Sequence, residues 1–230
     1  MKYKFLLVLI LFLTNFIVKS QEDINQFDAQ GKRHGIWKKT FEDSDQIRYE
    51  GAFNHGKEIG IFKFYCSDCK KNPAIIKTFN EKDDTAQVVY LTIKGKLISE
   101  GKMKGKNRID EWLYYHKRAN SIMTKEFYTD GKLDGLKTTY YLNKIIAEEL
   151  AYKNGIKEGI NNYYSPDGVL LKKLIYKNDE LHGPAFYYDA LGNVTLKGNY
   201  KNGRKHGVWK YYKDGKFIKE ETFPRPLSHH

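Results

Sequence analysis

The chain has 230 residues, of which 15% are aromatic and 18 are tyrosines, and its formal net charge is +12. Because only 40% of the residues are hydrophobic, the chain can cover a sheet face with amphipathic rings but has little with which to fill a thick core. The basic balance favours acidic partners, but the lysines are spread along the chain, which argues against a nucleic-acid-binding protein.

The chain begins with the features of a secretory signal peptide. Lys2 and Lys4 precede an apolar run over residues 5–18, and Ser20 is a small residue at the expected cleavage point. The run is short for a bilayer span, which takes about 20 apolar residues, and a retained membrane anchor is the alternative. We therefore expect residues 1–20 to be removed. The exported chain, whether periplasmic, outer-surface or secreted, then carries a net charge of +9, because three lysines and no acidic residue are lost.

A motif recurs along the remaining chain at intervals of 24 or 25 residues, apart from one double interval of 50 residues between Gly60 and Asp110. Each copy is marked by a glycine, except that Asp110 stands where one further glycine would fall. We call these residues the ladder positions: Gly35, Gly60, Asp110, Gly135, Gly159, Gly183 and Gly207. From Gly60 onward a large residue stands seven positions earlier, namely Phe53, Met103, Tyr128, Tyr152, Tyr176 and Tyr200. Self-similarity at such a period indicates a repeat architecture.

Each repeat has the pattern of a β-hairpin. A short run such as VWKYY or PAFYY follows the ladder position, and Tyr and Trp favour strands. A turn comes next, as at Asp214-Gly215, where glycine accepts a positive φ. Residues 145–152 also fit a helix, but their place in the repeat favours a strand. The predicted fold is all-β: an elongated, curved, largely single-layered antiparallel meander of about seven to eight hairpin repeats, with roughly fifteen strands.

The rhythm of the repeats is interrupted over residues 66–87 and resumes where Gly95 matches Gly215. One degenerate repeat with an enlarged turn falls here, and such an insertion is either a neutral surface loop or a binding loop. The predicted organisation is therefore a signal peptide, a repeat domain over 21–223 that contains this irregular insertion, and a C-terminal tail over 224–230.

The insertion opens with a C-x-x-C motif formed by Cys66 and Cys69. In the oxidising compartment that export implies, a disulfide that closes the turn is the simplest interpretation. A zinc site would need two further ligands, and the sequence has no second C-x-x-C.

The alternation Y-x-N-G-x-x-x-G-x-W-x-Y-Y-x-D-G resembles the MORN-repeat variant found in bacteria, a group often labelled toxin–antitoxin-type antitoxin repeat proteins. The likeness covers nearly all of 31–223 and is best from Tyr128 onward. It implies a β-hairpin repeat fold and a scaffold or binding role. For MORN repeats proper it also implies attachment to membrane surfaces and protein assembly. The resemblance supplies no catalytic residues, and a signal peptide fits poorly with a cytoplasmic antitoxin.

Two aromatic columns follow the ladder positions at distances of two and four residues. The first contains Trp37, Phe62, Trp112 and Trp209, and the second contains Phe64, Tyr114, Tyr163, Tyr187 and Tyr211. Because residues two apart on a strand share a face, these nine side chains are predicted to form one aromatic stripe. The stripe is either the core of a thin sheet or a stacking surface for sugars, lipid or a partner's apolar side chains, and both can hold.

A third column lies five residues after the ladder positions and is predicted to point to the other face of the sheet. It contains Tyr65, Tyr115, Tyr140, Tyr164, Tyr188 and Tyr212.

Neither a metal site nor a catalytic site is predicted. His34, His182 and His206 each precede a ladder position, but equivalent residues of adjacent hairpins lie about 10 Å apart, whereas Zn–N bonds are about 2 Å long. The sequence has no nucleophile elbow, P-loop, dinucleotide fingerprint or H-E-x-x-H motif. We therefore expect no enzyme, no cofactor and no metal.

The predicted function is that of an exported, non-enzymatic scaffold for protein–protein interaction at the cell envelope, with a protein partner. An alternative is a binder of anionic lipid or polysaccharide surfaces through lysines and the aromatic stripe, for which binding should fall steeply with salt. A second alternative is an antitoxin-like neutraliser of a partner protein. No nucleic-acid partner is expected.

Overall fold

The computed structural model describes residues 23–69 and 71–224. The predicted signal peptide at 1–20, and the predicted tail apart from Pro224, lie outside these residues. Within the described part the chain forms strands and turns only, so this part contains no helix that is long and apolar enough to cross a membrane.

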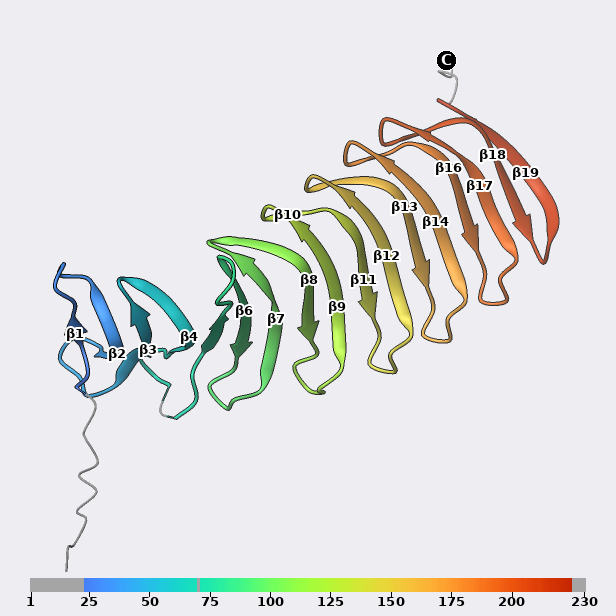
Figure 1. The fold of residues 1–230 in the computed structure, drawn as a ribbon. Coiled ribbons are helices and arrows are strands. Elements are labelled where there is room, and N and C mark those ends of the chain that lie inside the picture. Colours follow the sequence, from blue (N-terminus) through green and yellow to red (C-terminus); the bar gives the residue numbers. More distant parts are fainter. Residues whose placement is uncertain (1–22, 70, 225–230) are drawn as a thin grey trace, which may run out of the picture.

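The described residues form one antiparallel sheet of 19 strands (Figure 1). The strands are β1 (Gln26–Phe27), β2 (Arg33–Thr40), β3 (Ile47–Asn54), β4 (Lys57–Phe64), β5 (Ile75–Phe79), β6 (Thr85–Leu91), β7 (Leu97–Lys104), β8 (Asn107–Tyr115), β9 (Ile122–Thr129), β10 (Lys132–Leu133), β11 (Gly135–Tyr140), β12 (Ile146–Lys153), β13 (Ile156–Tyr164), β14 (Leu170–Lys177), β15 (Glu180–Leu181), β16 (Gly183–Tyr188), β17 (Val194–Lys201), β18 (Arg204–Lys213) and β19 (Lys216–Phe223).

Strands that follow one another along the chain lie side by side, except that β10 and β11 both pair with β9, and β15 and β16 both pair with β14. The sheet is open, because β1 pairs with β2 at one end and β19 pairs with β18 at the other. Figure 1 shows the strands as an elongated, curved array. The predicted all-β hairpin meander is confirmed. There are more strands than the roughly fifteen expected, in part because Asp134 and His182 each divide one strand in two.

The ladder positions have a backbone conformation that explains their composition. All seven have positive φ, which is 56° at Asp110 and lies between 63° and 129° at the six glycines. Glycine adopts this region without steric cost, and aspartate is among the few other residues that tolerate it. The chain therefore bends at these points.

Hydrogen bonds also join several turns to the turn of the preceding repeat. The Gly131 N–H donates to the Arg108 carbonyl at 2.9 Å, and the Gly155 N–H donates to the Leu133 carbonyl at 2.7 Å. The Gly203 N–H makes the same bond to the Leu181 carbonyl at 2.9 Å. Backbone groups exposed at one turn are thus satisfied by the next repeat, and the copies stack in a fixed register.

Residues 66–87 were predicted to hold one degenerate repeat with an enlarged turn. This range contains β5 and the beginning of β6, and β5 pairs with both β4 and β6. Apolar residues such as Ile75 pair within the same sheet, although this segment lacks the repeat motif. The irregular part narrows to the segments before and after β5, and the first of these contains a disulfide between Cys66 and Cys69.

The core lies on one face of the sheet, which we call the ring face; the opposite side is the second face. Three clusters of buried residues form this core. They are Trp37, Phe53 and Phe62; Ala86, Val88 and Trp112; and Leu174, Ala185 and Trp209. No second layer covers the sheet in the described part of the chain, so these side chains exclude water by packing sideways against one another.

Candidate binding surfaces on the two faces

Three large rings of the ring face lie flat on glycines of the preceding strand. Phe62 covers Gly51, Trp112 covers Gly101 and Trp209 covers Gly198. A Cβ at Gly198 would lie 2.3 Å from Cδ2 of Trp209, far inside van der Waals contact. Of the chain's 19 glycines, 16 have positive φ and these three do not. They are required for space rather than for backbone conformation.

In three of the remaining repeats the ring is replaced by a residue that is not aromatic, and the glycine of the preceding strand is replaced by a larger residue. Where the ladder position is followed by Lys137, Asn161 or Ala185 instead of a large ring, the residue eleven positions earlier is Glu126, Leu150 or Leu174. Lys137 and Glu126 form an ion pair, with Lys137 Nζ 3.0 Å from Glu126 Oε1. The exceptions to the predicted aromatic column are therefore compensated by a larger side chain on the neighbouring strand.

Trp112 and Trp209 also each donate a hydrogen bond to a backbone carbonyl at an irregularity in the sheet. Trp112 Nε1 donates to the Lys102 carbonyl at 3.0 Å, and Trp209 Nε1 donates to the Asn199 carbonyl at 3.1 Å. The strand register shifts next to each of these carbonyls. The indole thus replaces a hydrogen bond that the irregular ladder does not make.

The structure separates the nine residues of the predicted aromatic stripe into two groups. Phe62, Trp112 and Trp209 have no exposed surface and Trp37 is 7% exposed, so these four are core residues. The second column is half-buried and borders solvent. It consists of Phe64, Tyr114, Tyr163, Tyr187 and Tyr211. The hypothesis that the stripe binds a partner therefore depends on this second group.

Sequence reasoning missed a cation that covers each tryptophan cluster. The guanidinium carbon of Arg108 lies 4.5 Å from the centre of the Trp112 ring, and Arg108 Nη1 donates to the Tyr114 hydroxyl at 2.6 Å. Lys205 lies in the same way 4.3 Å from the centre of the Trp209 ring. Arg33 covers Trp37 as well. In all three cases the Arg or Lys stands four residues before the Trp, a sequence pattern from which these contacts could have been predicted.

Burial and hydrogen bonds between tyrosines keep the ring-face phenols neutral. Burial, followed by the hydrogen bond with Tyr128, raises the pKa of Tyr114 well above its ordinary value. Burial and the bond to Tyr200 likewise raise the pKa of Tyr187, and the two hydroxyl oxygens lie 3.0 Å apart. The half-buried column therefore offers neutral rings with polar tips, which suits recognition better than charge-based attraction.

On the second face, tyrosines of the third column donate to glutamates of the neighbouring strand. Tyr65 donates to Glu50 at 2.9 Å, and Tyr164 donates to Glu149 at 2.8 Å. Tyr115 makes the equivalent bond to a glutamate of β7. Burial and these carboxylates raise the pKa values of Tyr65 and Tyr115 to about 12.

We expect the thermal stability of the protein to fall as the pH rises from about 10 to about 12. The pKa of Tyr65 is raised from 10.0 to about 12 in the fold. The unfolded chain therefore loses this proton first, and the stabilising contribution, complete below pH 10, is lost as the pH approaches 12. Melting temperatures across this range, with the tyrosinate absorbance, measure the effect. Tyr65→Phe should flatten the slope, whereas an unchanged slope in this variant would contradict the assignment.

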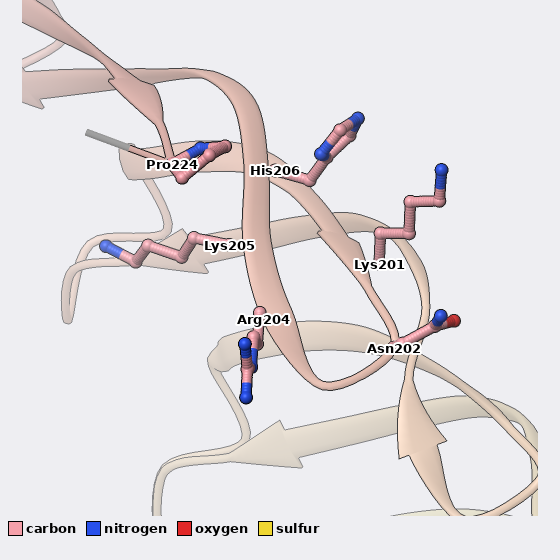
Figure 2. A pocket seen from close by; sticks show the side chains of 6 residues that line it. All are labelled: Lys201, Asn202, Arg204, Lys205, His206 and Pro224. Carbon is pink, nitrogen blue, oxygen red and sulfur yellow. The ribbon is translucent and has the colours of Figure 1, made fainter. Parts of the chain in front are cut away.

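One pocket lies at the turn between β17 and β18. It is lined by Lys201, Asn202, Arg204, Lys205, His206 and Pro224. Figure 2 shows that the charged ends of Lys201, Arg204 and Lys205 point away from one another, so they do not converge on a single anion. The described residues contain no group of three His, Cys, Asp or Glu side chains arranged to hold a metal.

The geometry is that of a β-hairpin repeat protein whose single sheet leaves both faces open for binding. Three consecutive segments, 133–154, 157–178 and 181–202, match the family described as MORN repeat variant. Repeats of this kind bind proteins or lipids in general, which is consistent with a non-enzymatic scaffold. The match gives no support to the antitoxin specification.

A comparison with curated proteins gave no match. Among solved structures, one similar chain belongs to a crystal structure of a Staphylococcus aureus TarM mutant in complex with fondaparinux, alpha-GlcNAc-glycerol and UDP. The two chains are 14% identical, with a TM-score of 0.33, over 50% of this chain. This chain spans about a fifth of that protein's length, since the match covers 21% of it, and the likeness carries no argument about function.

Proposed function

We propose that the chain is an exported, non-enzymatic scaffold that holds a protein partner at the cell envelope on its ring face. The main support is the half-buried tyrosine column, which borders solvent because no second layer formed by residues 23–69 or 71–224 covers the sheet. The proposal of export rests on the pattern of residues 1–20. Tyrosine offers a large, rigid contact area at low entropic cost, together with a hydroxyl for hydrogen bonding, and is enriched at protein interfaces.

The ring face is most uniform over the C-terminal repeats. Tyr163, Tyr187 and Tyr211 lie in one row, and Tyr176 and Tyr200 lie in the neighbouring row, all of them half-buried. Both rows lie beside the buried clusters of the ring face, so the rings are ordered before a partner binds. Such preorganisation reduces the entropic cost of binding.

A photo-crosslinking experiment tests this proposal. Benzoylphenylalanine is placed at Tyr163 or Tyr187, and for comparison at the adjacent Tyr164 or Tyr188, which point to the second face. We expect discrete protein adducts in the native envelope from the ring-face positions alone. The protein so captured should then bind the purified chain, with an affinity at least tenfold lower for the double variant Tyr163→Ser, Tyr187→Ser.

The second-face double variant Tyr164→Ser, Tyr188→Ser is the matched control and should retain the affinity. Equal crosslinking from both faces, or an affinity that only the second-face variant reduces, would contradict a ring-face site. Trp112→Ala is unsuitable for this purpose, since Trp112 is fully buried and its removal opens the core.

A further inference from the structure

A row of lysines crosses the second face near the C-terminal end of the sheet. In the strand pairing Lys173 lies beside Phe186, Phe186 beside Lys197, and Lys197 beside Lys210. Lateral partners in a sheet point to the same side, so these four residues form one line perpendicular to the strands. We call them the basic row. All three lysines are exposed, and Phe186 is half-buried between them.

Two other lysines of this face form ion pairs, whereas two members of the basic row do not. Lys63 Nζ lies 3.3 Å from Glu50, and Lys125 Nζ lies 2.9 Å from Glu111. Within residues 23–69 and 71–224, no carboxylate forms an ion pair with Lys173 or Lys197. Lys210 has a distant partner, with its Nζ 4.0 Å from Glu220. Positive charge is therefore uncompensated here, which favours a negatively charged ligand.

The reason for this difference lies in the column that faces the second-face tyrosines. In earlier repeats this column supplies Glu50 and Glu149, which accept hydrogen bonds from tyrosines. The equivalent residues of the repeats marked by Gly159 and Gly183 are Lys173 and Lys197, whereas the last repeat has Glu220. Lys197 Nζ lies 5.3 Å from the centre of the Tyr212 ring, and this cation–π contact stabilises the ammonium without neutralising its charge.

We propose that the basic row binds a linear, carboxylate-bearing polysaccharide that runs along the sheet, across strands β14 to β18. Successive strands lie about 4.8 Å apart, so Lys173 and Lys197 are about 10 Å apart. A linear polymer with repeated carboxylates meets such charges in turn, whereas a bilayer presents a two-dimensional charged surface. The half-buried Phe186 side chain gives a sugar ring an apolar surface between two ammonium groups. This site goes beyond the ring-face function and does not depend on it.

Titration of the full chain with polygalacturonate at low salt tests this proposal. We expect the triple variant Lys173→Gln, Lys197→Gln, Lys210→Gln to weaken binding by at least tenfold and to reduce its salt dependence. The control variant Lys104→Gln, Lys106→Gln, Lys132→Gln removes the same charge from exposed turns and should change the affinity less than threefold. Methyl-esterified polygalacturonate, which has the same backbone without the charge, should not bind.

Each contrary outcome identifies a different error. An equal loss in both triple variants would show that net charge, not the basic row, attracts the polymer. Binding to phosphatidylglycerol vesicles but not to polygalacturonate would replace the polysaccharide with a membrane, and equal binding to polyglutamate would replace it with an acidic protein segment. Ring-face crosslinks are scored on the same variants, so that failure at the basic row is distinguished from failure of the scaffold function.

Discussion

Gly198→Leu lowers the free energy of unfolding by about 3 kcal/mol, and the second change Trp209→Ala reduces that loss instead of adding to it. The single variant places side-chain atoms where the Trp209 ring lies, since even a Cβ would approach Cδ2 to 2.3 Å. Trp209→Ala alone should cost about 3–5 kcal/mol, because it empties the core of the last repeat. The double variant recreates the pair Leu174 and Ala185, which occupies the equivalent positions one repeat earlier.

A double-mutant cycle by urea unfolding measures this coupling, with amide hydrogen exchange in β17 and β18 as the local readout. If the two costs were additive, the double variant would lose about 6–8 kcal/mol. We expect a loss of about 2 kcal/mol or less, and an additive result would disprove the size-matching rule. Gly207→Ala is the control, because a Cβ there meets nothing within 4 Å and only the positive φ of 70° opposes it. Its cost should be about 1 kcal/mol, with no rescue by Trp209→Ala.

Trp112→Ala lowers the free energy of unfolding by about 3–5 kcal/mol and divides the array in two. Trp112 is fully buried and packs against Tyr90 and Tyr128, while its indole N–H satisfies the Lys102 carbonyl. The variant also leaves the Arg108 guanidinium without its main ring contact. Because each repeat contacts only its neighbours, the loss falls on the middle of the sheet and uncouples the repeats on either side.

Hydrogen exchange distinguishes this outcome from a uniform loss of stability. We expect faster exchange in β7 to β9 and separate unfolding transitions for the two ends of the chain, whereas Trp209→Ala should loosen only the last strands. Tyr115→Phe is the matched control three residues further along, since it removes a hydroxyl but leaves the ring, and should cost about 1 kcal/mol. A Trp112→Ala variant with a single unchanged transition would contradict the proposed role of this residue.

The amino-acid sequence by itself was sufficient to predict the architecture. The architecture follows from the regular spacing of the ladder positions, the turn residues between them and the short aromatic runs. All three depend on local backbone preferences, which can be recognised in the sequence alone. Contacts between consecutive hairpins are local as well, so the meander follows from the repeat. The repeat motif is absent from β5, within residues 66–87, although the apolar residues of this strand still fit the sheet.

The division of the aromatic stripe was decided by the tertiary structure. Burial of Trp112 depends on Gly101 in the neighbouring strand, and the two are brought together by a register shift that no local pattern predicts. The spacing of eleven residues between a ring-face glycine and its ring was visible, but its meaning appears only when the strands are paired. The prediction that the stripe binds a partner stays a prediction for its half-buried members.

The charges on the second face show the same limit. The sequence determined the number of lysines and their rough spacing along the repeats. Pairing in three dimensions decided that Lys125 is neutralised by Glu111, whereas no carboxylate among the described residues pairs with Lys197. An ion pair forms across strands over a few ångströms, whereas a periodic sequence specifies only which residues face the same way. The folded sheet therefore determines which charges are free to attract a ligand.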